Sequence, residues 1–197
     1  MPLTNLDRGV GTNAELGWTT LINFCPDICF QGPRVMRVLG VDPGIANVGF
    51  GIVEQWRGEV YDSKKYRVIA SGCLITSPRA SQHRRIYSIA RRIKYLIEAT
   101  EPDVIVVEDF VPFRQRKNMG TISQAFGSIQ YVCVDSKKKL IVVRANIWMR
   151  GLLNLRQKDR LGKRMIQRFV DKQLNVRTRV EHEAEALGMS LWYLRRH

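Results

Sequence analysis

The hairpin segment 38–53 constrains the fold of this chain more than any other part of the sequence. An apolar run ends at Asp42, a Pro-Gly pair follows at once, and a second apolar run begins shortly afterwards. Two apolar runs joined by turn residues predict two buried strands, over 36–42 and 47–55, with the Asp42 carboxylate held at a strand end. Asp-Pro-Gly is also an ordinary turn. An Asp-x-Gly turn also opens the phosphate-binding hairpin of sugar kinases and actin-like ATPases, so this segment alone does not define a function.

A second apolar run in the middle of the chain, 104–107, also ends in an acid, Glu108. Two strands that each end in an acid can bring the two carboxylates together at one edge of a sheet. Adjacent carboxylates repel each other unless a cation lies between them. Asp42 and Glu108 therefore predict a divalent-metal site.

A third group of candidate ligands opens the last predicted helix, 181–195. On a helix, His182 and Glu185 lie one turn apart on the same face. Small residues along this helix would let it lie close against the sheet and bring its first turn to the strand ends. Acids in a first helical turn are also common as partners of the helix dipole. Glu181 and Glu183 leave the register of the final acidic ligand open.

The chain is strongly basic, with 32 Lys and Arg against 18 Asp and Glu, a formal net charge of +14 over 197 residues. Such a surplus favours a polyanionic partner, because each phosphate that a basic side chain neutralises releases a condensed counterion. The basic residues are spread along the chain, so the body of the fold is the expected binding surface. A solvated basic surface without a ligand is the alternative.

The cysteines and the apolar stretches bear on the compartment in which the chain would work. Its four cysteines show only a weak Cys-x-x-x-Cys spacing, which indicates neither structural zinc nor an oxidising compartment. No apolar stretch is long enough to span a bilayer, and the first residues lack the pattern of a secretory signal. An intracellular, reducing location is therefore expected.

The chain divides into a short leader and one larger unit. Residues 1–35 show no sustained hydrophobic period and are interpreted as an N-terminal extension that packs on an α/β domain formed by 36–197. Three strands followed by alternating helices and strands predict a mixed sheet flanked by helices. Strands are predicted over 36–42, 47–55, 66–76, 104–108 and 140–143, and helices over 79–100, 119–132, 158–174 and 181–195.

The order of these motifs resembles that of the RuvC-type Holliday junction resolvases, which belong to the RNase H-like superfamily. The opening segment of that family is similar to 36–44, Met-Arg-Val-Leu-Gly-Val-Asp-Pro-Gly. Its terminal Asp-x-x-Asp-Ala-Leu block is similar to 182–187, His-Glu-Ala-Glu-Ala-Leu. Lys117-Asn118 followed by 120–127 resembles the helix entry after the second acid of the family. The resemblance covers 36–195.

Three departures from the family pattern bear on the site. His182 and Glu185 replace two Asp residues, although His is acceptable as a metal ligand. The segment 111–116, between the second acid and the next helix, is longer than usual. The basic motif that the family places before its penultimate helix is unclear here, and Lys163 is the nearest match.

The resemblance implies an RNase H-like fold with a five-stranded mixed sheet. It also implies a metal-dependent endonuclease that resolves four-way (Holliday) DNA junctions by paired symmetric nicks. Two Mg²⁺ ions per site are expected, Mn²⁺ would substitute, and Lys163 would offset charge on the phosphate. The implied metal ligands are Asp42, Glu108, His182 and Glu185. The residues expected to contact DNA are Phe113, Arg114, Arg116, Lys117 and Asn118.

Paired cuts in one junction require two sites, so a two-fold homodimer on branched DNA is the expected assembly. The apolar stripe of Ile122, Phe126 and Ile129 on the helix 119–132 is either a dimer surface or part of the core. The expected location is the cytoplasm or nucleoid, or the compartment where host or viral DNA replicates. A non-catalytic DNA-binding module on the same fold is the alternative function, and an actin-like ATP-binding domain is a third. Mg²⁺-dependent nicking of a synthetic junction without nucleotide would separate the three.

Overall fold

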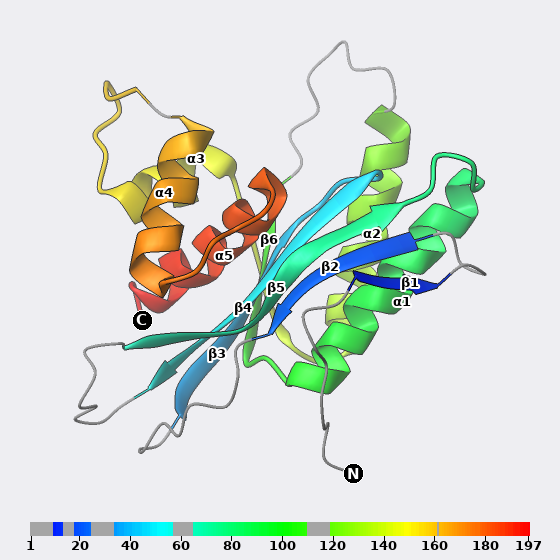
Figure 1. Ribbon diagram of the computed structural model, residues 1–197, viewed down its shortest axis with the longest axis horizontal. Coiled ribbons are helices and arrows are strands. Elements are labelled where there is room, and N and C mark those ends of the chain that lie inside the picture. The colour runs from blue at the N-terminus through cyan, green and yellow to red at the C-terminus, as the bar shows by residue number, and fades with distance from the viewer. Residues whose placement is uncertain (1–9, 14–17, 25–33, 57–64, 110–118, 161) are drawn as a thin grey trace.

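A twisted sheet with helices on both faces makes up the part of the chain that the computed structural model describes, residues 10–13, 18–24, 34–56, 65–109, 119–160 and 162–197 (Figure 1). Its strands are β1 (Val10–Asn13), β2 (Trp18–Phe24), β3 (Arg34–Asp42), β4 (Asn47–Trp56), β5 (Tyr66–Thr76), β6 (Val104–Glu108) and β7 (Lys139–Val143). Its helices are α1 (Gln82–Thr100), α2 (Met119–Asp135), α3 (Ala145–Leu153), α4 (Lys163–Leu174) and α5 (Glu181–Leu194). Within this part, no helix has the length and apolar character needed to cross a bilayer.

The strands lie in the order β1-β2-β5-β4-β3-β6-β7. β3 pairs in parallel with β6, and β6 with β7, whereas the other neighbouring strands are antiparallel. The five-stranded mixed sheet expected for 36–197 is confirmed as β5-β4-β3-β6-β7. The N-terminal extension, for which the sequence indicated no regular element, adds β2 and β1, because β2 pairs with β5 along its whole length.

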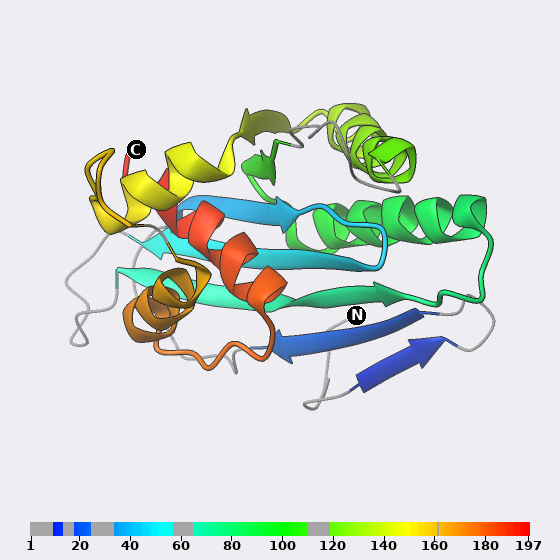
Figure 2. The same cartoon turned by 90° about the horizontal axis from the view of Figure 1, so that it is seen from above.

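The two faces of the sheet carry separate hydrophobic cores, because side chains alternate along each strand. Val38, Val104 and Val106 lie in the core that α3, α4 and α5 cover. Leu39 and Val107 lie in the core that α1 and α2 cover. Figures 1 and 2 show these helices as two layers on opposite sides of the sheet. A one-residue shift in the pairing register would move every side chain of a strand to the other face of the sheet. The need to bury the apolar side chains therefore fixes the register, and with it the side chains that point toward α5.

Helix α5 lies directly against the backbone of β3 and β4. A Cβ on Gly40 would overlap the carbonyl oxygen of Ala186. A Cβ on Gly49 would overlap the carbonyl oxygen of His182, in the first turn of the helix. The strand glycines thus let α5 approach the sheet more closely than any side chain would allow, as the small residues of the helix predicted.

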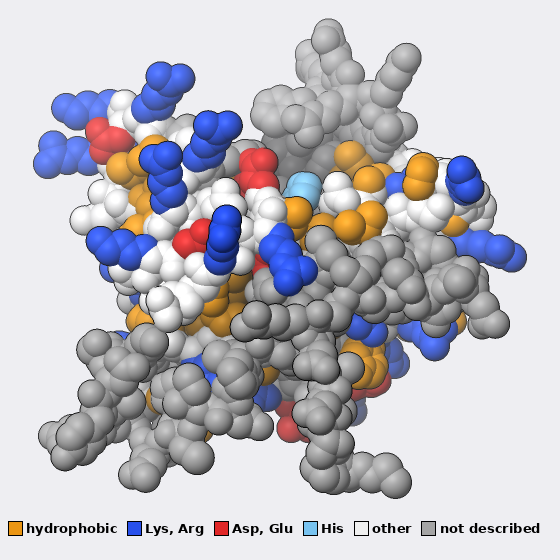
Figure 3. All heavy atoms as spheres, in the orientation of Figure 1, with side chains coloured by type: hydrophobic (Ala, Val, Ile, Leu, Met, Phe, Trp, Pro, Cys, Tyr) orange, Lys and Arg blue, Asp and Glu red, His pale blue; other side chains and the backbone are white. Residues whose placement is uncertain are grey.

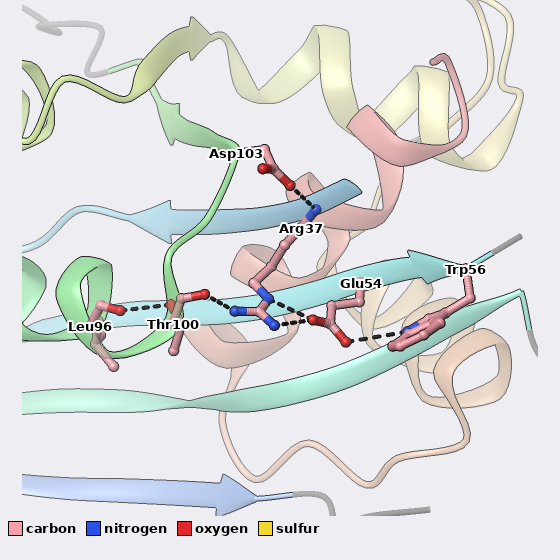
Figure 4. A network of polar contacts seen from close by, with 6 residues as sticks. All are labelled: Arg37, Glu54, Trp56, Leu96, Thr100 and Asp103. Carbon is pink, nitrogen blue, oxygen red and sulfur yellow. Dashed lines mark hydrogen bonds and ion pairs between the residues drawn. The ribbon is translucent and has the colours of Figure 1, made fainter. Parts of the chain in front are cut away.

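A polar network around Arg37 aligns β3 with β6 at the end of the sheet away from Asp42 (Figure 4). The Arg37 backbone N–H donates to Asp103 Oδ2 at 2.7 Å, and the Asp103 N–H donates to the Arg37 carbonyl oxygen at 2.8 Å. The Arg37 guanidinium donates to the buried Glu54 carboxylate and to a carbonyl oxygen at the end of α1. Both strands then run the same number of residues to their acids, so this alignment also places Asp42 and Glu108 at adjacent strand ends.

The helical region before α5 differs from the prediction in two respects. The predicted helix 158–174 begins only at Lys163, because a turn precedes it in which the Arg156 backbone N–H donates to Asp159 Oδ2 at 2.7 Å. Helix α3, which follows β7 and contributes Trp148 to the core, was not predicted from the sequence. This helix is short and its N-cap side chain makes no capping hydrogen bond, so its local signals are weak.

Candidate active site

Three side chains from β3 and α5 converge at one edge of the sheet. One ligand atom from each of Asp42, His182 and Glu185 lies within 4.8 Å of the other two. Asp42 is 7% exposed and Glu185 is 3% exposed, whereas His182 is half-buried. Two buried carboxylates this close to each other are repulsive when both are charged. The cluster therefore has the donor set of a cation site.

The imidazole of His182 contacts Asp42 directly, with Nδ1 of the ring 2.5 Å from Asp42 Oδ2. The contact orients the ring toward the end of β3. A hydrogen bond to one ring nitrogen also sets whether the other nitrogen donates or accepts. An imidazole and a carboxylate at this distance can share a proton or bind the same cation. The partly exposed ring leaves the cluster accessible from solvent.

Glu108 lies at the end of the neighbouring strand, β6. Val41 pairs with Val107 in the parallel register, so the next residue on each strand is one of the two acids. Val41 and Val107 belong to the core under α1 and α2, so alternation directs Asp42 and Glu108 to the opposite face, where α5 lies. The half-buried Glu108 accepts a hydrogen bond at Oε2 from the Trp148 indole N–H, at 2.8 Å. Among the described residues, Glu108 is not part of the 4.8 Å group, so three of the four predicted ligands cluster and the fourth ends the adjoining strand.

The other acids at the start of α5 have different surroundings. Glu183 is buried, and its carboxylate accepts hydrogen bonds from the Ser71 hydroxyl at 2.7 Å and from the Arg179 backbone N–H at 2.8 Å. These bonds tie the start of α5 to β5 and stabilise a helix whose N-cap side chain makes no capping bond. Glu181 is exposed. Of the acids whose register the sequence left open, Glu185 is the one that joins the cluster.

The turn that follows Asp42 is held by the end of β5 and the start of α1. The Thr76 hydroxyl donates to the Ile45 carbonyl oxygen at 2.6 Å, and Arg85 Nε donates to Thr76 Oγ1 at 2.8 Å. A second nitrogen of Arg85 donates to the same carbonyl oxygen at 3.2 Å. Sequence reasoning missed both side chains, because no local motif marks residues that act across the sheet.

A cysteine on β5 lies level with Gly49, which pairs with Asp42 on the other side. Burial, and then the negative charges of Asp42 and Glu183, raise the pKa of the Cys73 thiol to about 11. The thiol is therefore protonated at neutral pH, and a protonated thiol is a poor metal ligand. The donor set at this edge consists of carboxylates and an imidazole.

Basic side chains cover the helices beside the cluster. Figure 3 shows Lys and Arg gathered over α3 and α4. On α4, Arg164, Arg168 and Lys172 are exposed and recur at every fourth residue, so they form a stripe along one side of the helix. This α4 basic stripe has the charge and spacing to follow a phosphate backbone.

Several predicted residues fall elsewhere. Lys163 is the first residue of α4, and its side chain lies outside the described part of the structure. In α2, Ile129 is fully buried, Phe126 packs against the core and Ile122 is half-buried, so this stripe mainly faces the core. The predicted DNA contacts also lie outside the described residues: Phe113, Arg114, Arg116, Lys117 and Asn118.

Known proteins share the sequence pattern of this chain. Residues 38–192 match the family described as crossover junction endodeoxyribonuclease RuvC. The chain is 26% identical over 161 residues to the crossover junction endodeoxyribonuclease RuvC of Fusobacterium nucleatum, and this match covers 81% of this chain and 80% of that protein. It is 35% identical over 95 residues to the protein of the same name from Borrelia turicatae, and this match covers 48% of this chain and 55% of that protein.

Solved structures share the fold. The RuvC structure from Thermus thermophilus has a TM-score of 0.68 at 23% identity, and the match covers 82% of this chain and 96% of that one. The same protein in complex with a Holliday junction substrate has a TM-score of 0.67 at 22% identity, with the same coverage. The expected RNase H-like fold is thereby confirmed, and β1 and β2 lie outside the range of the family match.

Proposed function

The chain belongs to the RuvC family of crossover junction endodeoxyribonucleases, and we propose that it cuts four-way DNA junctions at the cluster of Asp42, His182 and Glu185. The observation that carries this assignment of the site is the convergence of their ligand atoms within 4.8 Å. Bringing two buried carboxylates together costs free energy unless a cation compensates their charge. The cluster lies in a protein of net charge +14, which suits a phosphodiester substrate.

The proposed cofactor is Mg²⁺, with two ions per site and Mn²⁺ as a substitute. Its ligands would be Asp42, Glu108, His182 and Glu185, because Mg²⁺ prefers carboxylate oxygens and Mn²⁺ also accepts imidazole nitrogen. When bound, the metal would supply an activated water and stabilise charge on the phosphate. Asp42 adjoins both His182 and the strand that ends in Glu108, so it is the acid best placed to hold the metal together with either of them. Lys163 would offset charge on the phosphate.

The proposed DNA surface combines the α4 basic stripe with the segment 113–118 that precedes α2. The stripe residues are exposed and lie on the same face of the sheet as α5. Basic side chains there would follow the duplex arms, and either Phe110 or Phe113 would stack on a base at an opened junction. Charge would supply affinity in this arrangement, whereas the placement of two sites would supply the preference for a branched shape.

The proposed assembly is a homodimer, since two symmetric cuts require two sites related by a two-fold axis. Because the stripe of Ile122, Phe126 and Ile129 mainly faces the core, the other side of α2 is the candidate surface. Tyr131 is 70% exposed and Val134 is 64% exposed, and they lie one turn apart on that helix. Exposed apolar side chains grouped in this way are typical of an interface.

Cleavage of a synthetic four-way junction by the purified chain tests the proposed function. We expect paired nicks when Mg²⁺ is present and no nucleotide cofactor is added. Chelation of the metal should abolish these nicks. Asp42→Asn should abolish cleavage and leave junction binding equal or tighter, because it removes a negative charge near the phosphate. Glu181→Gln, at an exposed acid near the cluster, is the control and should cut normally. Cleavage by Asp42→Asn would contradict the site, and binding without cleavage by the unmodified chain would favour the non-catalytic module.

A further inference from the structure

The indole of Trp148 lies against Glu108, the proposed ligand on β6. Its Nε1–H donates to Glu108 Oε2 at 2.8 Å, and the side chain is fully buried. A hydrogen bond to a carboxylate is stronger than one between neutral groups, and a buried ring has little freedom to turn. The orientation of the Glu108 side chain is therefore set partly from α3.

The start of α3 is joined to the end of β6. Glu108 pairs with Val143, the last residue of β7, and the Asp109 backbone N–H donates to the Val143 carbonyl oxygen at 2.7 Å. The Arg144 Nε lies 3.7 Å from Asp109 Oδ2 at the same point. Helix α3 begins directly afterwards, with Trp148 in its first turn. The indole and the carboxylate thus meet because β6 pairs with β7 at Glu108 and α3 begins directly after β7.

The Trp148 ring also packs against α5. A Cβ added to Gly188 would lie 2.9 Å from Cζ3 of the ring, so the helix backbone and the ring are in close contact. Gly188 lies about one turn beyond Glu185 on that helix. The ring is therefore held between the helix that carries His182 and the strand that carries Glu108, and its movement would disturb either side of the site.

The need of a buried indole N–H for a partner is an alternative reason for this contact. The same core contains a second tryptophan, Trp192, whose Nε1 is buried without a hydrogen-bond partner among the described residues. An indole in this core can therefore lie without a hydrogen-bond partner among the described residues. Satisfaction of the N–H alone does not account for the direction of Trp148 toward a proposed metal ligand.

We propose that Trp148 is a positioning residue that orients the Glu108 carboxylate for metal binding, an inference that rests on the proposed function. Hydrogen bonds to metal ligands fix their orientation, and their loss typically weakens metal binding about 10- to 100-fold. Trp148→Phe keeps an aromatic ring but removes the N–H. We expect it to weaken Mn²⁺ binding by about 10-fold or more.

Calorimetric titration with Mn²⁺ in the absence of DNA measures this effect without relying on cleavage. Trp192→Phe is the matched control, because it removes the same atoms from the same core without removing a hydrogen bond between described residues. It should lower thermal stability but leave Mn²⁺ affinity unchanged. In a Glu108→Gln background, Trp148→Phe should have no further effect on affinity, because the carboxylate that would bind the metal is already gone. Wild-type affinity in Trp148→Phe, or equal losses in both Trp variants, would overturn the proposal.

A second measurement leaves Trp148 in place. The chain has four tryptophans, whose indole N–H groups can be followed by NMR after ¹⁵N labelling. Glu108→Gln should move one indole resonance, because the acceptor changes from a carboxylate to a neutral amide. If none moves, the inference is wrong even where Trp148→Phe does not fold. Failure of the wild-type chain to bind Mn²⁺ and to cut junctions would refute the proposed function itself, whereas intact metal binding in Trp148→Phe refutes this inference alone.

Discussion

At the residue scale, His182 tests the site most directly, because it occupies a position where the family pattern has an Asp. Its Nδ1 lies 2.5 Å from Asp42 Oδ2, so it is placed to bind the same cation or to orient a water. His182→Asp should retain cleavage. His182→Ala should lose about 100-fold or more in rate, the scale of losing a positioned ligand or proton acceptor. Single-turnover rates with Mg²⁺ and with Mn²⁺ measure both effects.

The control for this series is Glu181→Ala, which alters an exposed neighbour of His182 on the same helical turn. It should cut at the wild-type rate, and thermal unfolding should show that all three variants remain folded. A His182→Ala protein that cuts like wild type would mean that the carboxylates act without the imidazole, and the four-residue site would then be wrong.

At the scale of elements, the close contact of α5 with β3 decides where the first turn of the helix lies. Gly40→Ala would place a Cβ on the Ala186 carbonyl oxygen, and backbone cannot rotate away as a side chain can. We expect a loss of about 1–3 kcal/mol in the free energy of unfolding, typical of an overpacked core. Cleavage should fall as well at temperatures where the variant is folded, because α5 carries His182 and Glu185.

Gly127→Ala on α2 is the matched control, because a Cβ there would meet no atom of the described residues within 4 Å apart from its own stretch of helix. It should raise stability by about 0.5–1 kcal/mol, since glycine is unfavourable inside a helix, and leave cleavage unchanged. Urea unfolding and junction cutting measure both variants. An unchanged stability and rate for Gly40→Ala would show that α5 has room to move away from the sheet.

The strands β1 and β2 lie outside the range of the family match. β2 pairs with β5 from Trp18↔Thr76 to Phe24↔Ala70, so it covers the edge that β5 would otherwise present to other chains. The boundary between an extension at 1–35 and a nuclease domain at 36–197 stays a prediction. A covered edge explains how a segment without hydrophobic periodicity can still form strands, because the backbone of β5 supplies the partner.

At the scale of the whole molecule, the basic surface should make junction binding strongly dependent on salt. The logarithm of the binding constant should fall by about 0.9 per phosphate contact for each tenfold rise in salt. Replacing Arg164, Arg168 and Lys172 by Gln should reduce that slope. Replacing the exposed Arg79, Arg84 and Arg91, at and before α1, removes equal charge and should reduce it less. Equal changes in the two triple variants would mean that net charge and not the α4 basic stripe binds the arms.

The proposed dimer can be tested independently of cleavage. Tyr131→Asp with Val134→Asp places two charges on the exposed side of α2 and should shift sedimentation from dimer to monomer. Tyr87→Asp, at a tyrosine that is also exposed but lies on α1, is the control and should leave the assembly intact. A dimer that survives the α2 changes would place the interface elsewhere.

Local patterns were enough to predict most of the elements. These patterns involve residues close together in the chain: the apolar runs and turns around Asp42 and Glu108, and the helical spacing of 79–100 and 181–195. Period and turn chemistry therefore predicted the central hairpin, the mixed sheet and the acids at the element ends. The same reasoning failed for β1, β2 and α3, whose local signals are weak and whose stability comes from partners far along the chain.

The choice among nearby acids, and the residues that support them, depended on contacts between distant segments. Helical spacing placed Glu185 on the same face as His182, but only the packing shows that Glu183 bonds Ser71 on β5 while Glu185 joins Asp42. Trp148 likewise reads as an ordinary core residue until its N–H is seen to meet Glu108. A sequence pattern predicts which secondary structure a segment forms and which of its faces is buried. Which side chains then meet across the sheet depends on strand register and on how closely a helix approaches the sheet, and these arise only when the chain packs.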